Sequence, residues 1–356
     1  MFLRTASIAK HIAKKVPANI MRKLRRVPPI DVLVSDWAER LGKVGAKRKI
    51  LYLAIKYDYG DENRGLSYEE YNFLGSIKEL DAEIIRLDIY TLHRLYGKEA
   101  VTKAVKEAVL IHNIDTLIYF RYTDILDHQL LKELRDGYKL HTIIWLSDDD
   151  VRYEQTKELV RCFSLVVTTI LERHKQRQKL GINSYHAQFY SNTTLYRNLH
   201  IKKAYDVVFI GQKFGSRGAS VDFLRRNGID VRTFGPFWGA GSRLSQMEMI
   251  DVINKAKIML NFSGSSKDPS KRYIKGRVFE IIACGAFMLT EECNDLDLYL
   301  QRGKEVVTFE GKEDMLAKIR HYLAHEQERE AIAAAGERKI RREYTYRGAF
   351  KKILGV

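Results

Sequence analysis

Residues 275–292, "KGRVFEIIACGAFMLTEE", carry the strongest fold signal in the chain. They run from a basic loop with a glycine, through a short segment of helical character, to a second glycine and an apolar strand. In the middle, Glu280 stands between Phe279 and Ile281. Because burying a carboxylate costs free energy unless a partner compensates it, the sequence predicts a specific partner for Glu280. The partner is either a bound ligand or a group of the chain itself, which would be a neighbouring helix that Glu280 caps, or Arg277 or Lys275.

Helices and strands alternate on both sides of this stretch. The first series has buried strands predicted at 49–55, 82–89, 115–120, 141–147 and 164–170, with helices at 67–80 and 97–112 among them. The second series has strands at 205–211, 229–235, 257–263, 286–291 and 305–310, with helices at 218–228, 245–256, 312–329 and 328–354. Apolar strands separated by helices indicate parallel sheets covered on both faces.

The two series meet at 195–204, which predicts an α/β chain of two doubly wound, Rossmann-like domains. We expect a basic amphipathic extension at 1–45, a first domain at 46–202, a second domain at 203–338 and a C-terminal segment at 339–356. Ligands in such sheets bind beyond the carboxyl ends of the strands, so the site is expected in the cleft between the domains.

Composition limits the class of protein. The chain has 356 residues, more than one ordinary core needs. Its three cysteines, Cys162, Cys284 and Cys293, fit no disulfide framework and no metal-ligand spacing, which favours a reducing cytoplasm. No apolar run approaches the ~20 residues that span a bilayer, so we expect a protein that is soluble or peripheral at the inner face of the membrane.

The net charge of +16 is concentrated at the N-terminus, where residues 1–30 hold eight Lys and Arg and no Asp or Glu. Ile8, Ile12 and Val16 recur at helical spacing. One interpretation is docking on an anionic membrane surface or a lipid-linked substrate, and the other is a solvated extension. No compact nucleic-acid motif stands out, so no specific nucleic-acid partner is predicted.

Two loops of the second series are suited to phosphate. The "GQKFGSRG" turn (211–218) is a glycine-rich strand-to-helix turn containing Gly211 and Gly215. The "SKRYIKGR" loop (270–277) leads into a helix whose N-terminus favours anions. The alternative for such a charge run is a solvated loop.

Other motifs leave their alternatives open. "SDDD" (147–150) ends a strand, and Asp148 and Asp149 are candidates for a metal site, for binding or deprotonating an acceptor hydroxyl, or for a helix N-cap. In "FGPFWG" (234–239), Trp238 either stacks on a nucleobase or belongs to the core or hinge.

Residues 205–354 resemble the C-terminal half of the group 1 GT-B glycosyltransferases, most of all the CgeB-like (spore maturation protein) branch. The likeness rests on "YDVVFIGQKFGSRG", "AKIMLNFSGSS", the 275–292 stretch and the terminal "YTYRGAFKKIL", with weaker points at "IIWLSDDDVRYE" (143–154) and "QFYSNTTLYRNL" (188–199). It implies a GT-B fold whose last helix crosses back to the first domain. It also implies transfer of a sugar from a nucleotide-diphosphate sugar to a carbohydrate, lipid-linked or protein acceptor, with retention and without a cofactor or metal.

The resemblance also implies roles for residues. Glu280 would bind the donor ribose, and Arg217 and Lys275 would stabilise the leaving diphosphate, with Asp148 and Asp149 on the acceptor side. The remaining donor-binding candidates are Arg277, Gly276, Gly211, Lys213, Gly215, Ser263 and Trp238.

The chain departs from the family pattern at one position, because Arg272 stands where many relatives have a first glutamate. The donor sugar therefore cannot be inferred by analogy. Two further functions stay open. They are nonenzymatic binding of polyanions or surfaces on a degenerate GT-B fold, and sugar-nucleotide epimerisation.

Overall fold

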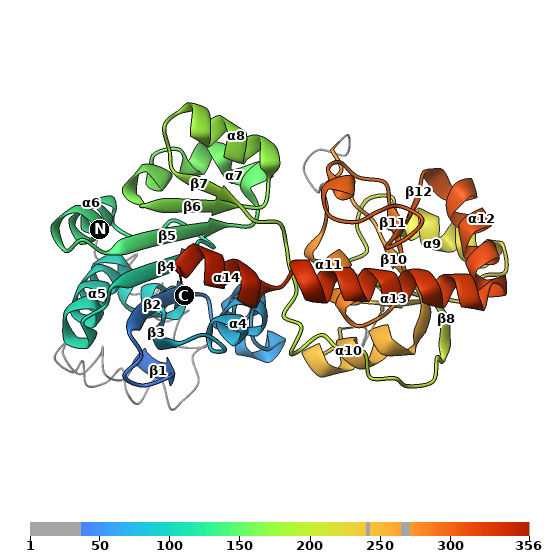
Figure 1. Ribbon diagram of the computed structural model, residues 1–356, viewed down its shortest axis with the longest axis horizontal. Helices are drawn as coiled ribbons and strands as arrows, with labels where there is room; N and C mark the ends of the chain where they lie inside the picture. The colour runs from blue at the N-terminus through green and yellow to red at the C-terminus, as the bar shows by residue number, and fades with distance from the viewer. Residues whose placement is uncertain (1–36, 240–242, 265–270, 356) are drawn as a thin grey trace, which may run out of the picture.

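The computed structural model describes residues 37–239, 243–264 and 271–355. They form two α/β halves that lie side by side, each with its own sheet (Figure 1). This arrangement confirms the expected pair of Rossmann-like domains. The predicted domain boundaries themselves stay predictions, and the basic segment 1–30 lies outside the described residues. None of the described helices is long and apolar enough to cross a membrane.

The first sheet has seven strands in the order β1-β3-β2-β4-β5-β6-β7. Their bounds are β1 Ala38–Gly42, β2 Arg48–Ala54, β3 Ala82–Asp88, β4 Thr116–Phe120, β5 His141–Leu146, β6 Leu165–Thr168 and β7 Ser184–His186. All pairs are parallel except β1 with β3. The two edge strands β1 and β7 are not predicted by the apolar pattern, because both are short and partly polar.

Short helical segments surround this sheet. They are η1 Asp58–Gly60, η2 Glu62–Arg64, η3 Glu69–Leu74, α4 Gly75–Ile77, α5 Ile89–His112, α6 His128–Lys132, η4 Glu133–Gly137, α7 Asp149–Thr156, η5 Leu159–Cys162 and α8 Leu171–Lys179. The predicted helix at 67–80 is a π-turn followed by one α-turn. Helix α5 begins at Ile89 rather than residue 97, and Gly97, with φ +83°, marks a break inside it.

The second sheet has five parallel strands in the order β12-β11-β10-β8-β9. Its strands are β8 Tyr205–Ile210, β9 Val231–Phe234, β10 Ala256–Asn261, β11 Met288–Glu291 and β12 Val307–Phe309. Its helices are α9 Arg217–Arg226, α10 Gln246–Lys255, α11 Gly276–Ala283, η6 Leu296–Leu298, α12 Gly311–Ala324 and α13 Glu326–Glu343.

Each sheet is buried on both faces. In β2, Leu51 and Leu53 belong to one hydrophobic cluster while Ile50 and Tyr52 belong to another on the opposite face. The strand period of two thus divides the core into two layers per sheet. This explains why the strands read as continuous apolar runs.

The C-terminal helix α14 (Tyr346–Leu354) crosses from the second half to the first (Figure 1). Tyr346, Phe350 and Leu354 are buried in the cluster over β2 and β4. The predicted single helix at 328–354 is wrong, because the chain leaves helical geometry at Tyr344 and starts again. Thr345 caps the new helix, its side chain accepting from the Gly348 N–H at 3.1 Å. The predicted crossing is confirmed.

Candidate active site

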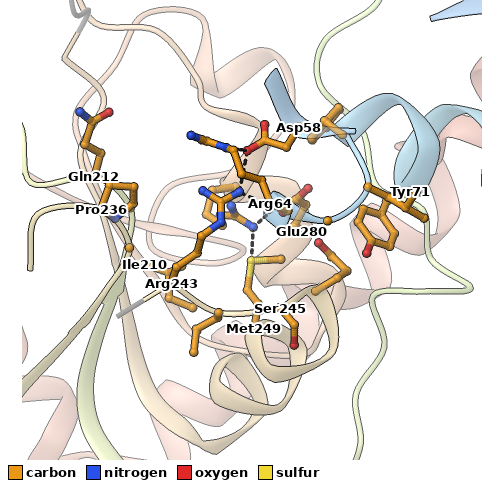
Figure 2. Close-up of a pocket in the computed structure, with 18 of the residues that line it drawn as sticks. Asp58, Arg64, Tyr71, Ile210, Gln212, Pro236, Arg243, Ser245, Met249 and Glu280 are labelled. Carbon is orange, nitrogen blue, oxygen red and sulfur yellow. Dashed lines mark hydrogen bonds and ion pairs between the residues drawn. The ribbon is translucent and has the colours of Figure 1, made fainter. Parts of the chain in front are cut away.

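A pocket of about 670 Å³ lies between the two halves. The first half contributes the η1–η2 loop and η3, and the second contributes the ends of β8 and β9 with α10 and α11. Figure 2 shows that Asp58, Arg64 and Tyr71 approach it from one half and Arg243, Met249 and Glu280 from the other. Its size falls within the range of ~300–1,000 Å³ typical of small-molecule sites.

Glu280 lies in the wall of this pocket with its side chain only 2% exposed. One carboxylate oxygen accepts hydrogen bonds from the Tyr196 hydroxyl at 2.7 Å and the Asn72 amide at 3.2 Å. The other accepts from Arg277 at 2.6 Å. The predicted specific partner is therefore found within the protein, and the pairing with Arg277 is present. The ribose role stays a prediction, in which a ribose hydroxyl would bond to a remaining lone pair of the carboxylate or replace one of these donors.

The groups around Glu280 keep the protonation states that these hydrogen bonds need. Burial raises the pKa of Tyr196 well above its usual value, and the neighbouring Glu280 raises it further, so the phenol remains a proton donor. Burial works against the Arg277 cation, but Glu280 together with Tyr196 and Tyr68 outweighs it, and the pKa of Arg277 is raised. Arg277 also contacts the sulfur of Met249 (Figure 2).

Gly276 is tightly enclosed. A Cβ at this position would lie 3.2 Å from the Phe189 ring and from the Tyr68 hydroxyl oxygen. Gly276 is not among the residues that line the 670 Å³ pocket, and its predicted contact with a donor stays a prediction. The close approach is to protein side chains, and the glycine allows the start of α11 to pack against them.

The turn at 211–218 is held by the loop after β9. The Gly211 N–H donates to the Phe234 carbonyl at 2.8 Å, and the Lys213 N–H to the Pro236 carbonyl at 3.0 Å. These two N–H groups are therefore not free to bind phosphate, which corrects the predicted cradle at both positions. Gly211 does line the 670 Å³ pocket.

Trp238 supports the same turn. Its indole N–H donates to the Gly211 carbonyl at 2.7 Å, and its ring meets Phe209 edge to face at 5.9 Å. The Lys213 ammonium lies 5.3 Å from the ring centroid. Trp238 is not among the residues that line the pocket. The structure thus favours the core alternative for Trp238 over nucleobase stacking.

A smaller pocket of about 140 Å³ adjoins Gly215, Arg217, Arg272 and Glu291. Arg217 donates to the Gln212 carbonyl at 3.1 Å, and burial lowers the pKa of its guanidinium. Arg272 pairs with Glu291 at 3.3 Å. Ser263 is buried, and both its N–H and its hydroxyl donate to Glu291, at 2.9 and 2.8 Å. Ser263 therefore positions Glu291, while Arg217 and Gly215 remain candidates for diphosphate.

Lys275 stands at the N-cap of α11. Burial lowers the pKa of its ammonium, Asp150 and Asp148 oppose this, and Arg217 adds to it. These neighbours come from both halves. Lys275 therefore sits where the acidic end of β5 faces the basic loops of the second half.

The acidic run after β5 divides into two environments. Asp148 has a side chain that is 62% exposed, with Arg152 at 3.7 Å, and it makes no capping hydrogen bond to α7. Asp149 is fully buried, paired with Arg177 and bonded to the Thr168 hydroxyl at 2.6 Å. Contact of Asp149 with an acceptor is therefore a wrong prediction, because both its oxygens are taken inside the core. Within 37–239, 243–264 and 271–355, no group of three or more His, Cys, Asp or Glu could hold a metal ion.

Sequence reasoning missed a contact that crosses the pocket. Arg243 reaches across from the second half to Asp58 at 2.5 Å and to the Arg64 carbonyl at 3.2 Å (Figure 2). Arg64 itself pairs with Asp58 at 3.0 Å. Asn72 and Tyr196, the partners of Glu280, were missed as well. In each of these contacts between the halves or with Glu280 the two partners lie far apart in the sequence, and no local motif links them.

Comparisons with known proteins agree with this architecture. Residues 217–355 match the family model described as glycosyl transferase-like. The spore protein CgeB of Bacillus subtilis (strain 168) is 22% identical over 249 residues, which cover 63% of this chain and 77% of CgeB.

Two solved structures show the same fold over nearly the whole chain. The sucrose-phosphate synthase of Thermosynechococcus elongatus has a TM-score of 0.59 at 9% identity, covering 87% of this chain and 98% of that one. Anabaena Alr3699/HepE, solved in complex with UDP-glucose, has a TM-score of 0.55 at 10% identity, covering 86% and 98%. These likenesses confirm the expected GT-B fold.

Proposed function

We propose that the chain is a glycosyltransferase related to the spore protein CgeB and that it takes its sugar from a uridine-diphosphate sugar. The observation that carries the choice of donor is the 670 Å³ pocket between the halves, with Glu280 and Arg277 in its wall. A solved protein of the same fold is described in complex with UDP-glucose. In our proposal the nucleotide occupies this pocket, and Glu280 accepts from the ribose hydroxyls.

The diphosphate would lie toward Lys275 and Arg217. Cleavage of the bond between the anomeric carbon and the phosphate oxygen leaves charge on that oxygen. The oxygen of the acceptor hydroxyl bonds to the same carbon and releases its proton, so that the products are the glycoside, UDP and a proton. Fixed cations and the N-terminus of α11 stabilise this charge, so we propose a reaction that needs no metal. Retention of configuration is proposed with it, on the resemblance to the family.

The experiment is an incubation of the full chain with a panel of UDP-sugars and candidate acceptors, with and without a chelator. We expect UDP release from at least one donor, unchanged by the chelator, and a glycosylated product. The variant Arg217→Ala should lower kcat at least about tenfold, since a cation facing the leaving group acts mainly in the transition state. The matched control Arg226→Ala, on the last turn of the same helix, should not.

Other outcomes would contradict the proposal. An epimerised nucleotide sugar formed from donor alone would identify an epimerase. Salt-sensitive binding of an anionic polymer, with no UDP release from any donor, would identify a nonenzymatic polyanion-binding protein.

A further inference from the structure

A third pocket, of about 50 Å³, lies at the carboxyl ends of β4 and β5 in the first half. Glu69, Arg121, Tyr122, Trp145 and Asp148 contribute to its wall. One water needs roughly 10–15 Å³ of such space, so the pocket has room for a small polar group. The donor role proposed above makes no use of it.

The wall of this pocket contains hydrogen-bond donors without acceptors. Trp145 is 1% exposed, and its indole N–H has no partner in the part of the chain that the structure describes. The Nε of Arg121 is also buried and has no partner there. A buried donor left unpaired costs about 1–3 kcal/mol, so such groups call for an explanation. An oxygen atom of a bound ligand would satisfy them.

The same wall supplies acceptors. Glu69 comes from η3, and burial raises the pKa of its carboxyl to about 7. Near neutral pH it therefore exchanges between a form that only accepts and a form that also donates. Asp148 adds a second, exposed carboxylate. A hydroxyl group both donates and accepts, so it matches a site that presents an N–H on one side and a carboxylate on the other.

An aromatic surface borders the pocket. Tyr59 is 62% exposed and meets Tyr122 edge to face at 5.9 Å, and Tyr122 in turn meets Tyr90 at 5.2 Å. The Arg64 guanidinium lies 4.4 Å from the centre of the Tyr59 ring. Exposed tyrosine rings present a flat apolar face with a polar tip. The C–H face of a pyranose ring packs well on such a surface.

The positive and negative charges in the wall of this pocket nearly balance. Arg121 and Arg152 stand with the carboxylates of Glu69 and Asp148, and Arg152 is already bonded to the Tyr122 carbonyl and lies near Asp148. The remaining acid, Asp149, is neutralised by Arg177. Because Glu69 is only partly ionised near neutral pH, the wall keeps a small excess of positive charge, too little to match a phosphate. A neutral ligand with several hydroxyl groups fits better than an anionic one.

We propose that this pocket binds a hydroxyl group of a neutral sugar, so that the acceptor is a carbohydrate. Glu69 and Trp145 bond the hydroxyl, and Tyr59 and Tyr122 pack on the sugar ring. Asp148 is one of the charges acting on Lys275, which places the pocket beside the residues proposed to hold the diphosphate. This inference rests on the proposed glycosyltransferase function and names the substrate class of its second half-site.

The test uses the indole N–H resonances of the full chain labelled with ¹⁵N-tryptophan. The chain has three tryptophans, and Trp145→Phe assigns the resonance in question. Methyl glycosides of glucose, galactose, mannose, rhamnose and N-acetylglucosamine are titrated with and without UDP. We expect at least one of them to shift the Trp145 resonance saturably and to leave that of Trp37 unmoved.

Variants test the assignment of the wall. Glu69→Gln and Asp148→Asn should each weaken the affinity for that glycoside at least about fivefold, because each variant loses one hydrogen bond between a carboxyl group and the sugar. Glu133→Gln, a carboxylate on η4 paired with Lys106 on the surface, should not change it. Since Asp148 is exposed, Asp148→Asn remains informative if Glu69→Gln does not fold.

Three results would each overturn the inference. In the first, no glycoside shifts the Trp145 resonance. In the second, Glu69→Gln and Asp148→Asn bind the glycoside as tightly as wild type does, and in the third, inorganic phosphate alone shifts the Trp145 resonance. Failure of the donor proposal would appear separately, as the absence of UDP binding. The titration without UDP reports on the sugar pocket alone, so the two proposals are tested independently.

Discussion

At the scale of single residues, Glu280 connects the pocket to the contact between the halves. Asn72, from the first half, and Arg277, from its own helix, both donate to its carboxylate. Asn72 is the donor from the other half, so a nucleotide that displaced it would break a contact between the halves. In that case nucleotide binding and the relative position of the halves would be coupled through this one side chain.

Glu69 gives a prediction for the pH dependence of stability. Burial raises the pKa of its carboxyl from 4.5 to about 7 in the folded chain. Between about pH 4.5 and 7 the unfolded chain loses this proton before the folded chain does, so stability falls as pH rises. Glutamine does not titrate, so the variant Glu69→Gln should lack this loss of stability. The difference in the free energy of unfolding, variant minus wild type, should therefore increase by up to about 3 kcal/mol between pH 4.5 and 8.

Urea unfolding at several pH values measures this difference, with Glu133→Gln as the exposed control. Parallel profiles for Glu69→Gln and wild type would show that Glu69 titrates normally in the folded chain. They would remove the protonation argument from the sugar pocket, while its unpaired N–H groups would remain.

The sequence predicts the partner of a residue when that partner is a neighbour on the same helix. It does not predict a partner that lies far away in the chain. Glu280 and Arg277 lie three apart on one helix, so their pairing was an open alternative from the start. Asp149 was assigned to the cleft, yet Arg177, 28 residues later on α8, draws it into the core. No property of the "SDDD" run distinguishes Asp149 from Asp148 before the sheet and α8 are assembled.

At the scale of elements, α14 fixes the second half to the first. The Phe350 ring is buried against Trp145, with ring centres 5.4 Å apart. Phe350→Ala should therefore lower the free energy of unfolding by about 3–5 kcal/mol, as expected for deleting a buried aromatic side chain. Lys351→Ala, on the exposed side of the same helix, should change it by less than about 0.5 kcal/mol.

Chemical denaturation monitored by circular dichroism makes this comparison. Equal stabilities of Phe350→Ala and Lys351→Ala would mean that α14 is not anchored on the first half. The buried position of Phe350 would then have no energetic consequence.

The apolar pattern predicted most elements correctly because their strands are buried on both faces. It failed at the ends of the sheet and at the last helix. The edge strand β1, "AERLG", has little apolar content to reveal it. The break before α14 depends on Thr345, whose hydroxyl caps the helix and whose backbone bridges to Ser191. Neither contact alters the helical spacing of the apolar residues around it.

At the scale of the whole molecule, Arg243 and Asp58 form an ion pair across the pocket between the halves. The two side chains are 43% and 30% exposed, so the pair contributes no more than about 1 kcal/mol. Arg243→Ala and Asp58→Asn should each weaken UDP binding less than about fivefold. The double variant should lose less than the sum of the two, because the second change removes a contact that is already broken.

A double-mutant cycle on the dissociation constant for UDP measures this coupling. Strictly additive losses would show that the contact does not help to close the pocket around the nucleotide. The bonds that Arg243 makes, including the one to the Arg64 carbonyl, would then stabilise only the η1–η2 loop.

The basic segment at 1–30 lies outside the described residues, and its role remains a prediction. If it docks on anionic membranes, the full chain should float with vesicles containing phosphatidylglycerol and not with pure phosphatidylcholine. Binding should be lost in roughly 0.5 M salt, where screening is strong. Changing Arg22, Lys23, Arg25 and Arg26 to Gln should abolish flotation and leave UDP affinity unchanged. Equal flotation of the variant would contradict the membrane role.

The central claim is that the pocket between the halves binds UDP through Glu280, and calorimetric titration of the full chain with UDP tests it most directly. We predict saturable binding in the presence of a chelator, weakened at least about tenfold in Glu280→Gln, since hydrogen bonds to a charged carboxylate are stronger than those to an amide. Glu313→Gln, on the exposed face of α12, should bind as wild type does. The absence of UDP binding, or equal affinities in Glu280→Gln and Glu313→Gln, would contradict the account.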